Sequence, residues 1–167
     1  MRTTLISIIA LAACGGGGKP ANTTPTDSTA TTTSGAAKTG TSGVKNLDWG
    51  AGADAISAAF PQATPQPGGM WSNGTSDGIE AITSFKLGAH GLEKVAVEWT
   101  SGFISMDDCA TGWKKVRAIY DGRFGASQAD NLAASWKTPT VSVTLTCSPN
   151  ESGAGVLSAT FAQPDAK

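Results

Sequence analysis

The chain has 167 residues, a formal net charge of −1, one His and three Cys. From Leu47 onward eight Lys and Arg stand against twelve Asp and Glu, a net charge near −4. Because no basic stripe or cluster is present, nucleic-acid binding is disfavoured. With a single His, a zinc site of the usual ligand spacing cannot be assembled unless the cysteines are free. The aromatic residues all lie between Trp49 and Phe161, which predicts one folded domain.

The first thirteen residues have the pattern of an export signal. Met1-Arg2 supplies a short positive region, and the apolar run Thr3–Ala13 is too short to cross a bilayer, which needs about 20 residues. The run ends in Leu11-Ala12-Ala13-Cys14, which resembles the lipobox of bacterial lipoproteins. An ordinary secretory signal that ends in Cys is the alternative, and the short length leaves open a start codon upstream.

The lipobox resemblance implies a lipid anchor on Cys14. In that family diacylglycerol is attached to the cysteine sulfur, the signal is cleaved before the cysteine, and the new amine receives a fatty acid such as palmitate. Two or more chains give stable membrane anchoring. Gly15, rather than the aspartate of inner-membrane retention, favours the outer membrane. We therefore expect residues 1–13 to be a signal peptide and the mature protein to sit in the cell envelope.

Residues 14–46 predict a flexible linker. Between Gly15 and Asn46 there are nine Thr, seven Gly, four Ala and three Ser, and Val44 is the one large aliphatic residue. Such a composition has little apolar surface with which to offset the entropy of ordering the backbone. The Gly15–Gly18 run lacks the strand and the Gly-Lys-Ser/Thr ending of a phosphate loop. The predicted domain then spans residues 47–163, followed by a tail at 164–167.

In the first half of the domain, Asp48 can cap a helix over Ala53–Phe60, which Pro61 ends. Residues 62–78 are rich in Gly, Pro and Asn and predict a loop, or a brief edge strand around Met70-Trp71. Residues 79–87 and 92–100 alternate in polarity and predict a hairpin through the Gly88–Gly91 connection.

In the second half, Ser105 or Asp107 can cap a helix that ends at Gly122 or Gly125. Its apolar stripe has helical spacing and consists of Cys109, Trp113, Val116 and Tyr120. Alternation then predicts strands at 132–136, 140–147 and 157–161. The predicted order is α-β-β-α-β-β-β, with two helix-plus-antiparallel-hairpin units forming a small sheet packed by helices, an α+β fold.

Cys109 and Cys147 are predicted to form a disulfide. Cys109 lies on the apolar stripe of its helix and Cys147 on the apolar face of its strand, so both face the helix–sheet interface. An isolated cysteine pair in an exported protein is most simply oxidised. The element order and the lipobox together are similar to small exported domains of the β-lactamase-inhibitor-protein type and to outer-membrane-assembly lipoproteins of the SmpA/OmlA type.

No catalytic or cofactor constellation stands out. His90 lies in a turn without an adjacent nucleophile and carboxylate. Asp107-Asp108 and Asp121 lack the alternating oxygen ligands and glycine of a calcium loop, and helix capping explains the pair. Gly50-Ala51-Gly52 follows no strand and so does not predict a dinucleotide site. We therefore expect no enzyme activity, no metal and no cofactor.

Two places are candidates for binding. Met70 and Trp71 stand in a polar loop and could anchor a protein partner, although Trp71 could instead fold back over the first helix. The polar face of the first hairpin is the second place, and a solvated face of mixed charge is its simpler explanation; it carries Glu80, Lys86, Lys94 and Glu98. The sequence favours a membrane-anchored protein-binding or scaffolding module, with an inhibitor or small-ligand-binding module as the alternative.

Overall fold

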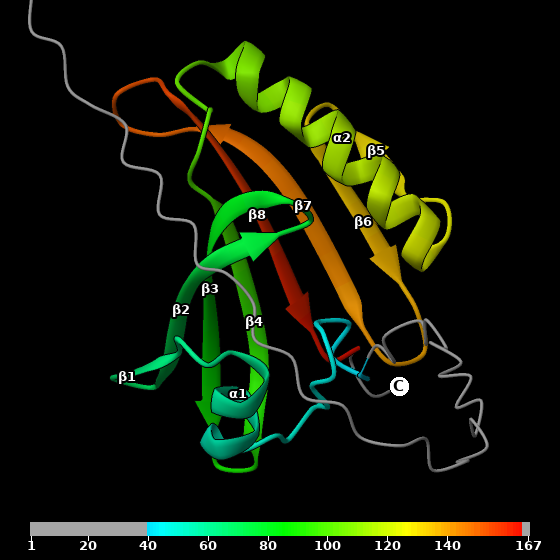
Figure 1. Cartoon of the computed structure of the whole chain (residues 1–167). Coiled ribbons are helices and arrows are strands. Elements are labelled where there is room, and N and C mark those ends of the chain that lie inside the picture. Colours follow the sequence, from blue (N-terminus) through cyan, green and yellow to red (C-terminus); the bar gives the residue numbers. More distant parts are fainter. Residues whose placement is uncertain (1–39, 165–167) are drawn as a thin grey trace, which may run out of the picture. The chain divides into compact units, whose positions relative to one another are not determined.

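The computed structural model describes residues 40–164, and within them it contains two helices and one eight-stranded antiparallel sheet (Figure 1). The predicted α+β class is therefore confirmed. The elements in chain order are α1 (Ala53–Ala59), β1 (Thr64–Gln66), β2 (Gly69–Ser76), β3 (Ile79–Gly88), β4 (Gly91–Trp99), α2 (Met106–Phe124), β5 (Gln128–Asp130), β6 (Ala133–Lys137), β7 (Ser142–Pro149) and β8 (Gly155–Ala162).

The described chain runs twice through the same succession, one helix followed by four strands. The strand order across the sheet is β1-β2-β3-β4-β8-β7-β6-β5, so each run builds one half and the two halves meet where β4 pairs with β8. All seven strand pairings are antiparallel. The central seam of the sheet therefore joins segments that lie about 60 residues apart, such as Val97 and Ala159.

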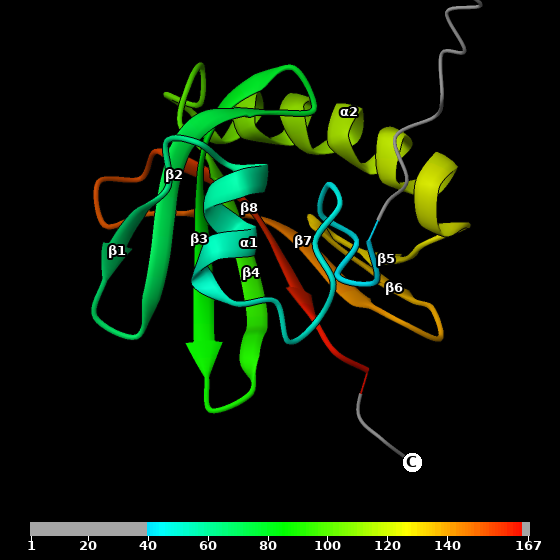
Figure 2. The same ribbon diagram turned by 60° about the horizontal axis from the view of Figure 1, so that its bottom comes forward.

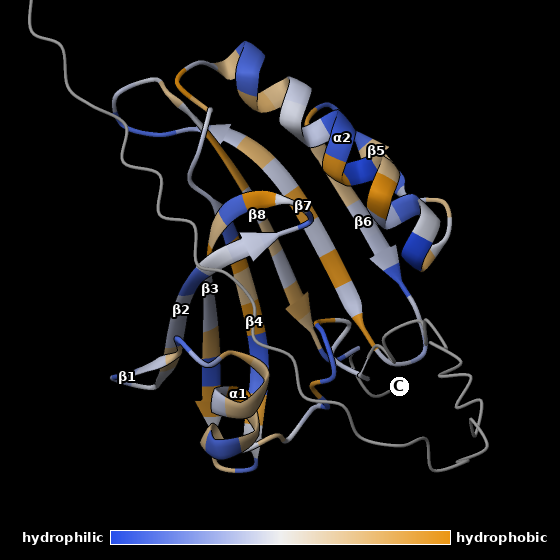
Figure 3. Cartoon of the chain, viewed as in Figure 1, coloured by the Kyte–Doolittle hydropathy of each residue, from blue (hydrophilic) through white to orange (hydrophobic). Residues whose placement is uncertain are grey.

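One face of the sheet is apolar because side chains alternate along each strand. The alternation is visible along β7 and β8 in Figure 3. The register of the strands aligns the inward-facing residues into rows that run across both halves of the sheet. One complete row consists of Met70, Phe85, Val95, Phe161, Val143 and Trp136, all buried.

Both described helices cover this same face. The α1 helix lies over β3 and β4 (Figures 1 and 2), and Phe60 at its end packs edge-on against Phe85 at 4.8 Å between ring centroids. The α2 helix packs on β6, β7 and β8. Its Tyr120 ring contacts Phe161 and Trp136, again inward-facing residues. The opposite face of the sheet, the outer face, has no described helix on it.

The long α2 helix begins and ends as the sequence predicts. Ser105 is the N-cap, and its hydroxyl accepts a hydrogen bond from the Asp108 backbone N–H at 3.1 Å. Gly125 closes the helix. The predicted stripe of four residues is buried against the sheet. No helix within residues 40–164 is long and apolar enough to cross a membrane.

The predicted disulfide between Cys109 and Cys147 is present, with the two Cα atoms 5.9 Å apart. It ties the first turn of α2 to β7. The close packing at this corner requires a glycine at position 155. A Cβ atom there would lie 2.3 Å from the Cys109 Cβ and 2.7 Å from the Ser105 carbonyl oxygen. The helix can approach β8 this closely because residue 155 has no side chain.

The predicted element order is incomplete, since it lacks β1, β2 and β5. The largest difference is β2, an eight-residue strand where the sequence predicted a loop or at most a brief edge strand around Met70-Trp71. It pairs with β3 along its whole length through a two-residue turn at Asp77-Gly78, where both residues have positive φ, +54° and +78°. This is the backbone that an Asp-Gly hairpin turn requires. Pro67-Gly68 forms the corresponding turn between β1 and β2.

Two predictions at the start of the domain are also corrected. Asp48 does not cap α1, whose N-cap is Gly52 without a side-chain hydrogen bond; the Asp48 carboxylate accepts hydrogen bonds from the Thr41 N–H and hydroxyl. Residues 40–46, assigned from sequence to the linker, pack on the domain. Ser42 is fully buried and donates a hydrogen bond to the Leu47 carbonyl at 2.7 Å.

Candidate functional site

A groove opens on the helical side of the sheet, between the two helices, and we call it the inter-helix groove. It consists of two adjoining cavities of about 330 and 250 Å³ that share the residues Lys45, Phe60, Thr75 and Thr83. Segment 43–45 and Phe60 form one wall, and the end of β2 with Asp77 forms the other. Tyr120 and Arg123 of α2 close one end of the larger cavity. It therefore lies where the two halves of the fold meet.

The floor of the groove contains the polar residues of an otherwise apolar sheet face. Ser72 and Thr83 are directly paired across β2 and β3 and are buried, with 4% and 6% of their surface exposed. Their row continues through the apolar residues Val97, Ala159, Leu145 and Ala134. Apart from Ser42, they are the only buried polar residues in the described part of the chain. This departure from the hydrophobic pattern coincides with the groove.

Two cations, Lys45 and Arg123, line the larger cavity, and each contacts neighbouring protein groups. Lys45 Nζ donates a hydrogen bond to the Ala59 carbonyl at 3.1 Å and stands 3.9 Å from the centre of the Phe60 ring. The Arg123 guanidinium donates to the Asp77 carboxylate at 2.9 Å and lies over the rings of Tyr120 and Phe124. Both cations therefore have protein partners without a ligand.

Tyr120 is the centre of the aromatic packing next to the groove. Its ring contacts Trp99, Phe124, Trp136 and Phe161. Burial raises the pKa of its hydroxyl, and the charge of Asp77 and a hydrogen bond to that carboxylate raise it further against the opposing effect of Arg123. The hydroxyl therefore stays neutral well above the pH at which a free tyrosine ionises.

The outer face of the sheet is the second candidate surface. Its middle row is uncharged across eight strands and consists of Thr64, Trp71, Ser84, Ala96, Thr160, Thr144, Ser135 and Gln128. The row on one side carries Lys86, Lys94 and Lys137, and the row on the other side carries Glu98 and Asp130. The face is thus a neutral strip between a basic and an acidic edge.

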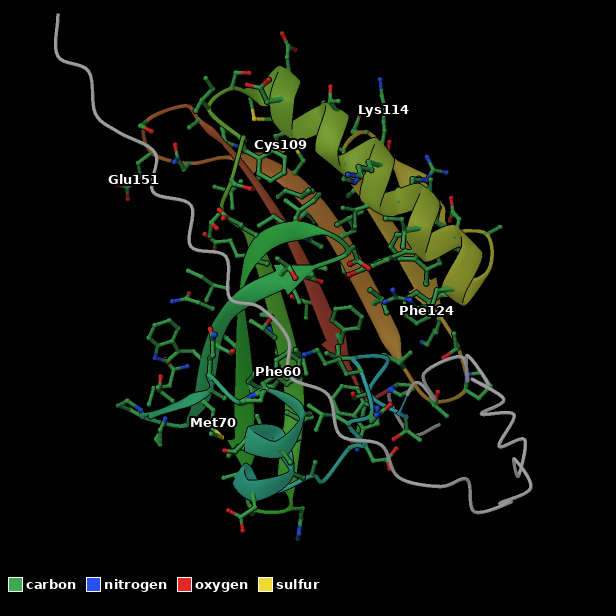
Figure 4. The ribbon with its side chains drawn as sticks, in the orientation of Figure 1. Phe60, Met70, Cys109, Lys114, Phe124 and Glu151 are labelled. Carbon is green, nitrogen blue, oxygen red and sulfur yellow. A yellow bond between two sulfur atoms is a disulfide. The ribbon has the colours of Figure 1, made fainter. Side chains whose placement is uncertain are left out.

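The predicted site residues lie in different places. Met70 is 3% exposed and belongs to the core, so it is not available to a partner in this fold (Figure 4). Trp71 points to the opposite side of β2 and lies half-buried on the outer face. Lys86, Lys94, Glu80 and Glu98 are exposed outward-facing residues. Cys14 and the lipobox lie outside the described residues.

Sequence reasoning missed the groove. Its walls come from segment 43–45, which was assigned to the linker, and from β2, which was predicted as a loop or a brief edge strand. The Asp77-Gly78 turn signal was the feature that could have revealed β2. His90 is exposed, and no group of three or more His, Cys, Asp or Glu residues within 40–164 is placed to hold a metal ion.

Comparison with known proteins gives no identification: no protein-family model, no curated protein and no solved structure matches this chain.

Proposed function

We propose that the protein is a lipid-anchored binding module of the bacterial cell envelope, attached to the outer membrane through Cys14, and that the outer face of its sheet contacts an envelope protein. The proposed protein contact rests on the outer face of the sheet. Both described helices lie on the other side of the sheet, which leaves one broad face that no other element within residues 40–164 covers.

The chemistry of this face favours a folded protein partner. The neutral middle row has Trp71 at one end and small residues such as Ser84, Ala96 and Thr160 along its centre, so a flat surface can approach the backbone closely. Trp is among the residue types most enriched at the anchor points of protein interfaces. The basic and acidic edges would orient a partner whose own charges are reversed, since complementary charges fix register.

The anchor is supported by the sequence pattern at Leu11–Cys14. Replacing Cys14 by Ser removes the sulfur that receives diacylglycerol. We expect the variant to lose labelling by radioactive or alkyne-tagged palmitate and to be released from the membrane fraction. Labelling that is unchanged in the Cys14→Ser variant would contradict the lipoprotein assignment, whereas the binding proposal would still stand.

The contact face is tested by photo-crosslinking in the native envelope. A photoreactive amino acid at Ser84 or Thr144 should crosslink to one defined envelope protein, and the same group at Lys114, which lies on the side of α2 away from the sheet (Figure 4), should not. A bulky charge in the neutral row, Thr160→Arg, should abolish the crosslink without lowering the melting temperature by more than a few degrees.

A matched substitution on the exposed side of α2, Ala118→Arg, serves as the control and should leave the crosslink intact. Three outcomes would contradict the proposed face: equal crosslinking from Lys114, no crosslink from the sheet positions, or crosslinks to a second copy of the chain alone.

A further inference from the structure

The floor of the inter-helix groove carries a hydroxyl that no protein group uses. The Ser72 hydroxyl donates to its neighbouring carbonyl at Asn73, at 3.2 Å. The Thr83 hydroxyl makes no hydrogen bond to any described residue, and Thr83 borders both cavities. Among the described residues the one fully buried side-chain polar atom without a partner is Trp113 Nε1, so the Thr83 oxygen is open to the groove rather than sealed in the core. It is therefore available to a ligand.

The charge of the larger cavity is positive, in contrast to the acidic domain around it. Lys45 and Arg123 line it, and Asp77 is the one carboxylate among its lining residues. Asp77 is already engaged by Arg123, which uses one of its five N–H donors in that contact and keeps others for a second acceptor. The arrangement leaves unused donors from two cations facing one cavity.

Both cations are pre-organised. Lys45 is fixed by the Ala59 carbonyl and the Phe60 ring, and Arg123 by Asp77 and two aromatic rings. A long side chain that is already ordered loses less conformational entropy when it binds an anion. The apolar surface open to the cavity comes mainly from Val44 and Phe60, because the other apolar lining residues, Val97 and Phe161, are almost fully buried. A volume of about 330 Å³ is at the lower end of the range for small-molecule sites.

We propose that the inter-helix groove binds a small organic carboxylate with an apolar or aromatic group. The carboxylate accepts hydrogen bonds from Lys45 and Arg123, the apolar group packs against Val44 and Phe60, and a polar atom of the ligand pairs with the Thr83 hydroxyl. The groove and the outer face lie on opposite sides of the sheet, so this site is independent of the proposed protein contact.

Phenylacetate is a suitable probe because it combines one carboxylate with one aromatic ring. Titration of the isotope-labelled full chain, followed by amide chemical shifts, should show saturable changes at Gly43, Lys45 and Thr83 with a dissociation constant on the order of 1 mM, as expected for a ligand of this size. Phenylacetamide has nearly the same shape without the charge and should bind about ten-fold more weakly. Equal binding of the acid and the amide, or no saturable shift with either, would overturn the proposal.

Two substitutions locate the site. Lys45→Gln removes a charge from an exposed side chain and should weaken phenylacetate binding about five- to ten-fold, whereas Lys114→Gln on the far side of α2 should have no effect. Thr83→Val should weaken binding without lowering the melting temperature by more than a few degrees, because it removes a hydroxyl that no protein group uses. Unchanged binding by Thr83→Val, or equal effects of the two lysine variants, would rule out the cavity as the site.

Discussion

The disulfide offers the most quantitative test of the fold. Cys109 and Cys147 are 38 residues apart in sequence and both buried, with Cα atoms 5.9 Å apart. In the chain-entropy model, cross-linking a loop of this length destabilises the unfolded state by about 4 kcal/mol at 25 °C. The double variant Cys109→Ala/Cys147→Ala should lose about 2 to 4 kcal/mol of unfolding free energy, the lower value if the reduced unfolded chain is already compact.

Urea denaturation of the oxidised chain, the reduced chain and the double variant measures this loss. For a slope of about 2 kcal/mol/M, the midpoint should fall by about 1 to 2 M, and the slope should rise slightly because the unfolded chain without the cross-link exposes more surface. The double variant should still fold cooperatively, because Trp113, Val116, Tyr120 and their sheet partners do not depend on the bond. Cys14→Ser in every sample excludes disulfides through that residue. A midpoint shift under about 0.3 M, or loss of the cooperative transition, would refute the reasoning.

Three further predictions follow from single contacts. Gly155→Ala should cost about 1 to 3 kcal/mol in urea denaturation because the new methyl group would overlap Cys109 and the Ser105 carbonyl, whereas Gly74→Ala, with open space around it, should change stability by less than 1 kcal/mol. Tyr120 is the one tyrosine of the chain, so absorbance near 295 nm reports its ionisation alone. Because the pKa of Tyr120 is raised in the fold, tyrosinate should not form as pH passes 10 until the protein unfolds. The free energy of unfolding should therefore fall as pH rises above 10. Burial raises the pKa of Asp121, but hydrogen bonds from Ser127 and Trp136 outweigh it and hold the pKa below its usual value; Asp121→Asn should therefore lower the urea midpoint at pH 7, with the difference shrinking as pH falls below about 4.

The sequence was informative wherever the hydrophobic pattern was strong. The alternation in β3, β4, β7 and β8 identified the four central strands, and the spacing from Cys109 to Tyr120 identified the face of α2. Those two patterns were enough to pair the cysteines, since each placed one sulfur at the helix–sheet interface. The Ser105 cap followed from local chemistry, which does not depend on the rest of the fold.

The sequence did not predict the strands that form only because a neighbouring strand pairs with them. The β2 segment, Gly-Met-Trp-Ser-Asn-Gly-Thr-Ser, has almost none of the β-branched residues that favour strands. It is a strand because β3 supplies a hydrogen-bonding partner along its whole length and because Met70 fits the core. The short β1 and β5 strands, three exposed residues each, carry no burial pattern that could have predicted them.

The groove could not be predicted from the sequence, for a related reason. Its distinctive residues, Thr83 and Lys45, look ordinary on their own: the first is one polar residue in a strand, and the second is a lysine near the end of a polar segment. Thr83 alternates correctly with Ala81 and Phe85 and was placed on the inward face. What makes it unusual is the absence of a covering apolar side chain, and this depends on where α1, α2 and β2 end.

Segment 40–47 connects the proposed groove to the proposed anchor. Gly43 packs against Phe124 and Phe161, Ser42 is held by the Leu47 carbonyl, and Lys45 covers the Phe60 ring. The stretch that leads toward Cys14 thus builds one wall of the groove before it joins the domain at Leu47. A chain that begins at Leu47 would lose that wall, one of the two cations and the cover over Phe60. It should therefore be less stable than a chain that begins at Gly35 and should bind phenylacetate more weakly than Lys45→Gln. Equal affinity of the two chains would mean that segment 40–47 takes no part in the site.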